Sequence, residues 1–276
     1  MTAEDPPFPR RPERIMVALD EAPTSERVLA FACRLAAATG ARLTGLFVED
    51  SQLLELAGSG LARELGSYSG AARSLSASGL ERALETQAGA VQQRLQEAAR
   101  RAGVRWSFRM LRGPIHRELL SASGPEDLLI LGRGRRRRGL GAAVRRLVEE
   151  GRGSILVLGP ELTPESRSVV VQAATEDAEP AILAAADLAA TLGGALEVLL
   201  PAGGELREPR LRELLAGRRL ALHVRTLARL DVDAIFSEHG PRDADLLVLP
   251  PGEPFDRREV RLAVLARARG PVLLLG

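Results

Sequence analysis

Short apolar runs alternate with longer amphipathic segments along most of the chain. The first run, Arg14–Asp20, is apolar up to its acidic last residue and predicts a strand buried on both faces. A helical stripe of apolar residues follows and ends at a glycine: Val28, Leu29, Ala32, Leu35, Ala36 and Gly40. Further strands are predicted at 43–48, 104–110, 127–132 and 154–159, and helices at 79–102, 115–121 and 141–150. This alternation predicts βαβ crossovers and a parallel sheet.

The second part of the chain repeats the first. Four segments recur: 34–40 as 187–193, 43–48 as 196–201, 127–132 as 245–250, and 152–159 as 269–276. We therefore predict two tandem domains, at 10–160 and 165–276, joined where Pro, Glu and Thr cluster. The first copy is longer, and we place its excess in an insert at about 49–79 that is rich in Gly, Ser and Ala. Its leucines, which suggest packing against another surface, are Leu53, Leu54, Leu56 and Leu61.

Each copy is expected to form a five-stranded, mostly parallel sheet with helices on both faces. The last strands of the two copies, 154–158 and 271–275, are almost entirely apolar. We expect them to pair antiparallel, because this pairing would cover the edges that each sheet otherwise exposes. The chain would then be a pseudo-dimer within itself. A homodimer of whole chains is a further option that the sequence leaves open.

Composition excludes several kinds of chemistry. Lysine does not occur among the 38 cations of the 276 residues, so a Schiff-base lysine, a P-loop lysine and a lysine general base are all excluded. The single cysteine, Cys33, excludes an intrachain disulfide and a cysteine-based zinc site. A net charge of +2 argues against a uniformly basic nucleic-acid binder. With no apolar stretch of about 18 residues, we expect a cytoplasmic protein with no membrane partner and no sequence-specific nucleic-acid partner.

Candidate binding residues gather where strands of the first copy end. In an open parallel sheet, ligands bind at the carboxyl ends of the strands, and Asp20, Val48 and Gly132 stand at three such ends. The segment 132–142 then leads into a helix, and its glycines allow backbone N–H groups to approach an anion. Five arginines, Arg133 and Arg135–Arg138, lie in this segment. They fit phosphate ligands, a solvated loop, or an RNA or membrane contact, and the sequence leaves these alternatives open.

These features together resemble the universal stress protein family over Arg14–Gly276. The resemblance rests on the strand end Val17-Ala-Leu-Asp20, the helix end Arg34–Gly40, and the frame Asp-Leu-Leu-Ile-Leu-Gly followed by Ile-Leu-Val-Leu. It implies two tandem Rossmann-like domains of the adenine nucleotide alpha hydrolase type. It also implies a non-catalytic stress-response or signalling protein whose first domain binds ATP with Mg²⁺, or another phosphorylated small molecule. In family terms, Asp20 matches the strand-end aspartate, Val48 the valine near the adenine, and Gly132 the glycine that opens the phosphate loop.

The phosphate loop departs from the family pattern. Members that bind ATP carry Gly, two residues, Gly, nine residues, and then Gly-Ser or Gly-Thr. Here Arg135 replaces the second glycine, and the closing pair falls on Gly141-Ala142, about four residues early and without a hydroxyl. The expected ligand contacts are Asp20, Val48, Gly132, Arg133, Gly134, Arg135, Gly139, Gly141 and Ala142.

Two other interpretations accompany this one. The second copy has no aspartate after Val169–Ala174, and its Pro-rich segment 249–254 is a poor phosphate cradle, so that copy is expected to be structural. The alternative function is a ligand-free interaction protein that docks a protein partner through the Leu-rich insert and the Arg-rich loop. A slow ATP hydrolase would need Asp20 and Glu49 to act with Mg²⁺, and no convincing general base accompanies them.

Overall fold

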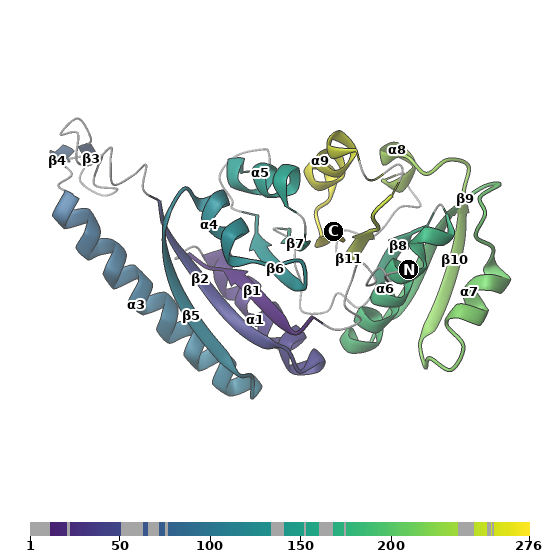
Figure 1. Cartoon of the computed structure of the whole chain (residues 1–276), viewed down its shortest axis with the longest axis horizontal. Coiled ribbons are helices and arrows are strands. Elements are labelled where there is room, and N and C mark those ends of the chain that lie inside the picture. Colours follow the sequence, from purple (N-terminus) through teal and green to yellow (C-terminus); the bar gives the residue numbers. More distant parts are fainter. Residues whose placement is uncertain are drawn as a thin grey trace, which may run out of the picture.

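A ten-stranded sheet forms the centre of the molecule, with helices on both of its faces (Figure 1). The structure is a computed structural model. It describes residues 12–20, 23–50, 63–65, 72–74, 77–133, 141–151, 153–159, 168–173, 175–236, 246–252, 255 and 257–276.

The first half contributes five adjacent strands to this sheet, in the order β5-β2-β1-β6-β7. Their bounds are β1 Arg14–Ala18, β2 Arg42–Asp50, β5 Trp106–Gly113, β6 Asp127–Gly132 and β7 Ser154–Leu158. All four pairings among them are parallel. The connecting helices are α1 Pro23–Thr39, α3 Ala77–Ala102, α4 Ile115–Ala122 and α5 Ala142–Glu150.

The second half repeats the same strand order, as β10-β9-β8-β11-β12. These strands are β8 Val169–Gln172, β9 Ala195–Pro201, β10 Ala221–Leu227, β11 Leu246–Leu249 and β12 Val272–Leu274. Their pairings with one another are also parallel. The helical elements are η1 Glu176–Ala178, α6 Glu179–Leu192, α7 Glu208–Leu214, α8 Val232–Ile235 and α9 Arg258–Arg267.

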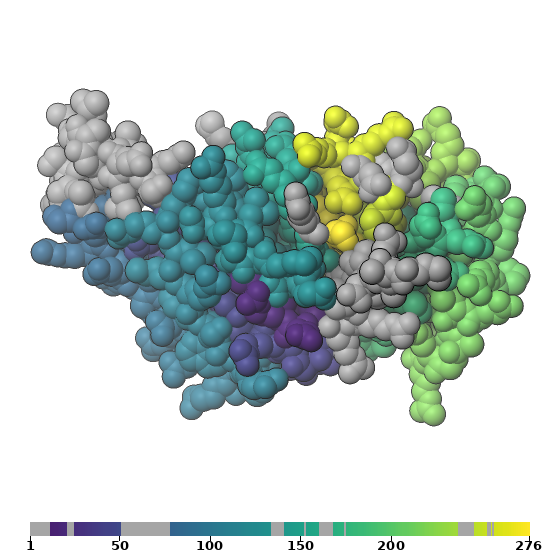
Figure 2. All heavy atoms as spheres, viewed as in Figure 1, coloured from purple at the N-terminus to yellow at the C-terminus, as the bar shows by residue number. Residues whose placement is uncertain are grey.

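The two halves meet at β7 and β12, which pair antiparallel with Leu156 opposite Leu273. This confirms the predicted pairing of the last strands and the pseudo-dimer within one chain. The backbones pass closely beside the seam, because a Cβ added to Gly159 would overlap the carbonyl oxygen of Arg269. On the surface, α5 and α9 touch across the same seam and appear as adjoining teal and yellow regions (Figure 2).

Each face of the sheet has its own apolar core. One core packs α1, α3, α6 and α7 against the sheet, and the other packs α4, α5, α8 and α9 against the opposite face. Strand residues alternate between the two, as Ile15 and Val17 do with Met16 in β1. Burial on both sides explains the continuous apolar runs of the strands. Cys33 lies in the first core, and burial raises the pKa of its thiol to about 11.

The insert of the first half contains a short antiparallel pair of strands, β3 Arg63–Leu65 and β4 Ala72–Ser74. This pair lies at the end of the molecule beyond the start of α3, far from the second half (Figure 1). Leu53, Leu54, Leu56 and Leu61 lie outside the described residues. Within the part of the chain that the structure describes, no helix has the length and hydropathy needed to cross a membrane.

Candidate functional site

The structure brings the predicted strand-end residues of the first half to one edge of the sheet. Strand β1 lies between β2 and β6, with Ala18 opposite Leu46 and Val17 opposite Ile130. Two residues further along, Asp20 follows β1, while Val48 and Gly132 lie at the corresponding level of β2 and β6. This edge, which we call the first carboxyl edge, lies at the point where the strand order reverses, since β1 is the first strand and β2 and β6 leave it in opposite directions.

Asp20 is exposed, and Ser25 holds it in place. The Ser25 hydroxyl donates a hydrogen bond to the Asp20 carboxylate and accepts one from the Asp20 amide at 3.2 Å. Ser25 itself is buried in the first turns of α1. The contact therefore ties the end of β1 to the start of the following helix and fixes the position of the carboxylate.

Gly132 allows α1 to pass close to the end of β6. A Cβ at this position would stand 2.9 Å from Cγ2 of Val28, closer than real Cβ atoms approach a neighbour. The glycine is thus required by the packing of β6 against α1.

Arg133 is the first residue after β6, and its backbone amide donates to the Leu158 carbonyl at 2.9 Å. The Nε and Nη2 atoms of its guanidinium are buried, and among the described residues they have no hydrogen-bond partner. Burial lowers the pKa of Arg133 from its usual value, because the charged form loses solvation. An arginine nevertheless stays protonated in proteins, so a partly buried positive charge follows β6, with two buried donors that have no hydrogen-bond partner among the described residues.

The start of α5 adds further unpaired donors at this edge. Gly141 is the N-cap residue, and no side chain caps the helix there. The Gly141 carbonyl accepts from the Arg145 amide at 3.1 Å, and the first turn holds no acidic residue. An uncapped helix start exposes backbone N–H groups and the positive end of the helix dipole. Ala142, the first helical residue, is exposed and provides no hydroxyl.

Val48 and Glu49 point to opposite faces of the sheet. Val48 packs partly buried against the core under α4 and α5. Glu49 is only 1% exposed, and its Oε2 accepts from Nε of Arg112 at 2.8 Å. That bond raises the pKa of Arg112 above its usual value. Glu49 is therefore hydrogen-bonded to Arg112 through Oε2. Among the described residues, no group of three or more His, Cys, Asp or Glu side chains comes together in a way that could hold a metal ion.

The predicted site is only partly covered by the described residues. Asp20, Val48, Gly132 and Arg133 gather at the strand ends, and Gly141 with Ala142 begins α5. Gly134, Arg135 and Gly139 lie outside the described residues, as do the other arginines of that loop.

The equivalent edge of the second half differs in the residues that end and follow its strands, although α9, like α5, begins without a side-chain cap. Pro250 and Pro251 follow β11 at the positions that Gly132, the last residue of β6, and Arg133 have in the first half, and Gly252 has a positive φ of 100°. Gln172 ends β8 at the position that Ala18 has in β1. This glutamine is fully buried, and neither its amide nitrogen nor its amide oxygen has a hydrogen-bond partner among the described residues. Sequence reasoning missed Gln172, although a polar residue directly after three buried valines was a visible signal.

Comparisons with known proteins agree with the fold. The family model described as "Universal stress protein family" matches residues 12–150. A universal stress protein from Archaeoglobus fulgidus has a similar structure, with a TM-score of 0.68, 13% identity, and coverage of 95% of this chain and 98% of that chain. No curated protein sequence matches the chain.

Two further solved structures are similar over the whole length. A putative universal stress protein from Pseudomonas aeruginosa has a TM-score of 0.57 at 15% identity, and the match covers 96% of this chain and 94% of that one. The cytoplasmic domain of a prokaryotic cation chloride cotransporter has a TM-score of 0.54 at 14% identity, with 95% and 94% covered. At these identities the similarity extends to the fold alone.

Proposed function

The chain belongs to the universal stress protein family, and we propose that its first half is a non-catalytic binding domain for a nucleotide or another phosphorylated small molecule. In this proposal residues 10–160 form the binding domain. Residues 165–276 form a second copy that has lost the ligand and completes the shared sheet.

The observation that carries the proposal is the buried guanidinium of Arg133. A charge held out of water without a partner is unfavourable, and a phosphate oxygen at the first carboxyl edge would offset that penalty. Arginine also has the planar donor geometry that binds phosphate with two hydrogen bonds. Because Nε and Nη2 are both buried and unpaired, the two donors of such a bidentate contact are in place.

The surroundings of Arg133 support an anion over a neutral ligand. The uncapped start of α5 would supply backbone N–H groups. Gly132 directly precedes Arg133 and has no side chain to block the approach of an anion to its backbone. In the proposed site, Arg133, Gly134, Arg135, Gly139, Gly141 and Ala142 contact phosphate, Val48 lies near the base, and Asp20 accepts from a sugar hydroxyl. Mg²⁺ would enter with the phosphates of ATP, as is usual for this ion.

Calorimetric titration of ATP with Mg²⁺ into the full chain tests the proposal, with equilibrium dialysis against labelled ATP as a check that does not depend on heat. We expect micromolar affinity, about −8 kcal/mol. The variant Arg133→Leu should weaken binding tenfold or more, because one charge-assisted contact to phosphate is lost. Arg145→Leu removes an exposed arginine of α5 and should leave the affinity within about twofold, since exposed charges contribute little.

Two results would contradict the proposal. Equal affinity in the wild type and Arg133→Leu would remove the role of the buried guanidinium. Absence of ATP binding by both methods would favour the alternative function, in which the insert and the Arg-rich loop dock a protein partner without any ligand.

A further inference from the structure

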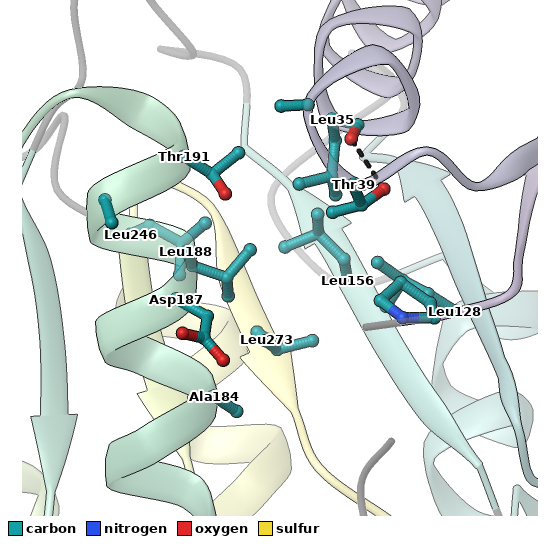
Figure 3. A pocket seen from close by; sticks show the side chains of 13 residues that line it. Leu35, Thr39, Leu128, Leu156, Ala184, Asp187, Leu188, Thr191, Leu246 and Leu273 are labelled. Atoms are coloured by element: carbon teal, nitrogen blue, oxygen red, sulfur yellow. Dashed lines mark hydrogen bonds between the residues drawn. The ribbon is translucent and has the colours of Figure 1, made fainter. Parts of the chain in front are cut away.

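A cavity of about 250 Å³ lies between the two halves, on the sheet face that α1 and α6 cover (Figure 3). Its walls come from the last turns of these two helices, and its floor comes from strands on both sides of the seam. The helices run away from the carboxyl edges, and α1 is 17 residues long. At 1.5 Å per residue, the cavity is therefore roughly 20 Å from the first carboxyl edge.

The apolar lining is built from equivalent residues of the two copies. Leu35 of α1 corresponds to Leu188 of α6, and each pair of floor residues also consists of leucines. These pairs are Leu35 with Leu188, Leu128 with Leu246, and Leu156 with Leu273. All six are buried, at 9% exposure or less. The cavity thus lies on the pseudo-twofold axis that relates the halves.

One departure from this symmetry leaves the space between the helices unfilled. On α6 the side chains of Ala184, Asp187, Leu188 and Thr191 project toward the gap, at the spacing of one helical stripe (Figure 3). Ala184 occupies the position that Phe31 has in α1. A methyl group replaces a phenyl ring there, so the α6 wall cannot fill the space between the helices.

A second departure gives the cavity a polar side. Asp187 stands where the first copy has Arg34, and its carboxylate accepts a hydrogen bond from the Arg218 guanidinium through Oδ1. Within the described part of the chain, neither Oδ2 of Asp187 nor the Thr191 hydroxyl makes a hydrogen bond. On the opposite wall, the Thr39 hydroxyl already donates to the Leu35 carbonyl at 2.8 Å. The Asp187 carboxylate at the cavity can therefore only accept a hydrogen bond, while the Thr191 hydroxyl can accept one as well as donate.

We propose that this cavity binds a small, largely hydrocarbon molecule that carries one N–H or O–H donor, with the donor directed at Asp187 and Thr191. An apolar cavity of about 150 Å³ is large enough for benzene. The larger volume here suits a fused two-ring molecule or a short alkyl chain. Leucine walls favour such a ligand, and a single polar contact sets its orientation. The site is separate from the proposed nucleotide site and stands whether or not ATP binds.

The test uses two probes of the same shape, indole with an N–H donor and indene without one, titrated into the full chain and followed by ligand-observed NMR. We expect saturable binding of both, with indole preferred about tenfold, because its N–H can donate to a carboxylate. In Asp187→Asn the preference should fall to threefold or less, since a neutral acceptor forms the weaker bond. The affinity for indene should remain unchanged.

Blocking variants locate the binding. Ala38 is an exposed residue at the cavity rim on α1, so Ala38→Phe should fold and abolish the binding of both probes. Ala37→Phe places the same ring on the neighbouring exposed position, outside the cavity, and should leave both affinities intact. Ala184→Leu fills the cavity from the opposite wall and should repeat the effect of Ala38→Phe.

Three results would overturn the proposal. They are no saturable binding of either probe, equal binding in Ala38→Phe and Ala37→Phe, and no preference for indole in the wild type.

Discussion

The two carboxyl edges of the sheet are built on the same five-strand order, yet they differ in the residues that end the strands. In the first half a glycine ends β6, and the arginine that follows it has two buried nitrogens without a hydrogen-bond partner among the described residues. In the second half two prolines follow β11, and the strand equivalent to β1 ends in Gln172, whose buried amide has no hydrogen-bond partner in the described part of the chain. Among the described residues, the first edge therefore holds a cationic group with two unpaired buried donors, and the second holds a neutral buried amide without a hydrogen-bond partner.

This difference indicates that the duplication preserved the strand order and the seam, but not the residues at the strand ends that would bind a ligand. Strand order and seam depend on apolar residues, which both copies retain, whereas a binding edge depends on a few residues at strand ends. Proline has no backbone N–H, so the second edge lacks two of the donors that the first edge has at the end of β6. Three changes test this comparison, starting from the one with the largest expected effect.

The seam that joins the halves should be the most sensitive position. Gly159→Ala places a Cβ against the Arg269 carbonyl, so the backbones must move apart, and we expect the free energy of unfolding to fall by roughly 3 kcal/mol. Gly141→Ala is the matched control, because a Cβ there meets nothing within 4 Å. Denaturant titration measures the free energy of unfolding of both variants. Equal stability of the two would show that the close backbone approach at the seam does not determine the stability of the fold.

The opposite, amino-terminal ends of the central strands also differ between the halves. Arg14 of β1 donates from Nε to the Asp127 carboxylate at 2.8 Å, whereas the second half has Ser168 in the position of Arg14. Asp127 also accepts from the Gly124 amide at 2.7 Å. Burial alone would raise the pKa of Asp127, but the hydrogen bonds from Arg14 and Gly124 outweigh it and hold the pKa below its usual range.

Asp127→Asn should therefore lower stability by roughly 2 kcal/mol at neutral pH. Because the folded-state pKa is depressed, the stabilisation is present above the unfolded pKa of about 4 and is lost as the pH falls through the folded value. Unfolding free energies measured from pH 7 to pH 2 should converge for the wild type and the variant at the acid end. A constant difference across that range would assign the loss to packing.

The smallest expected effect is a gain. Gln172→Met replaces a buried amide that has no described partner with an apolar side chain of similar length, and should raise stability by about 1 kcal/mol. Gln92→Met changes an exposed glutamine of α3 and should be neutral. If Gln172→Met instead destabilises the chain in denaturant titration, the amide has a partner such as a bound water.

Much of the fold was predictable because burial on both faces leaves a clear pattern in the sequence. The predicted strand 127–132 has the bounds of β6, and the pairing of 154–158 with the last strand is confirmed. Strand ends were harder to place. Strand β2 extends to Asp50, since Glu49 and Asp50 continue the ladder opposite Arg112 and Gly113, and such polar residues do not stand out as strand.

The candidate site was predictable in position but not in electrostatics. The carboxyl edge follows from strand order, so Asp20, Val48 and Gly132 could be placed beside one another from sequence. Whether Arg133 is buried or solvated depends on how its side chain packs after β6, which no local pattern encodes. The cavity between α1 and α6 could not be predicted from the sequence either, because it depends on how the two equivalent helices are placed across the seam.

Hydrogen-exchange mass spectrometry with and without ATP and Mg²⁺ compares the two edges most directly. We expect slower exchange in peptides that contain Asp20, Arg133 and the start of α5, and unchanged exchange in peptides that contain Gln172 or Pro250. In Arg133→Leu the same protection should require at least tenfold more ATP. Protection at the second edge, or no protection at the first edge at an ATP concentration that saturates binding, would contradict the claim that the first half alone holds the ligand.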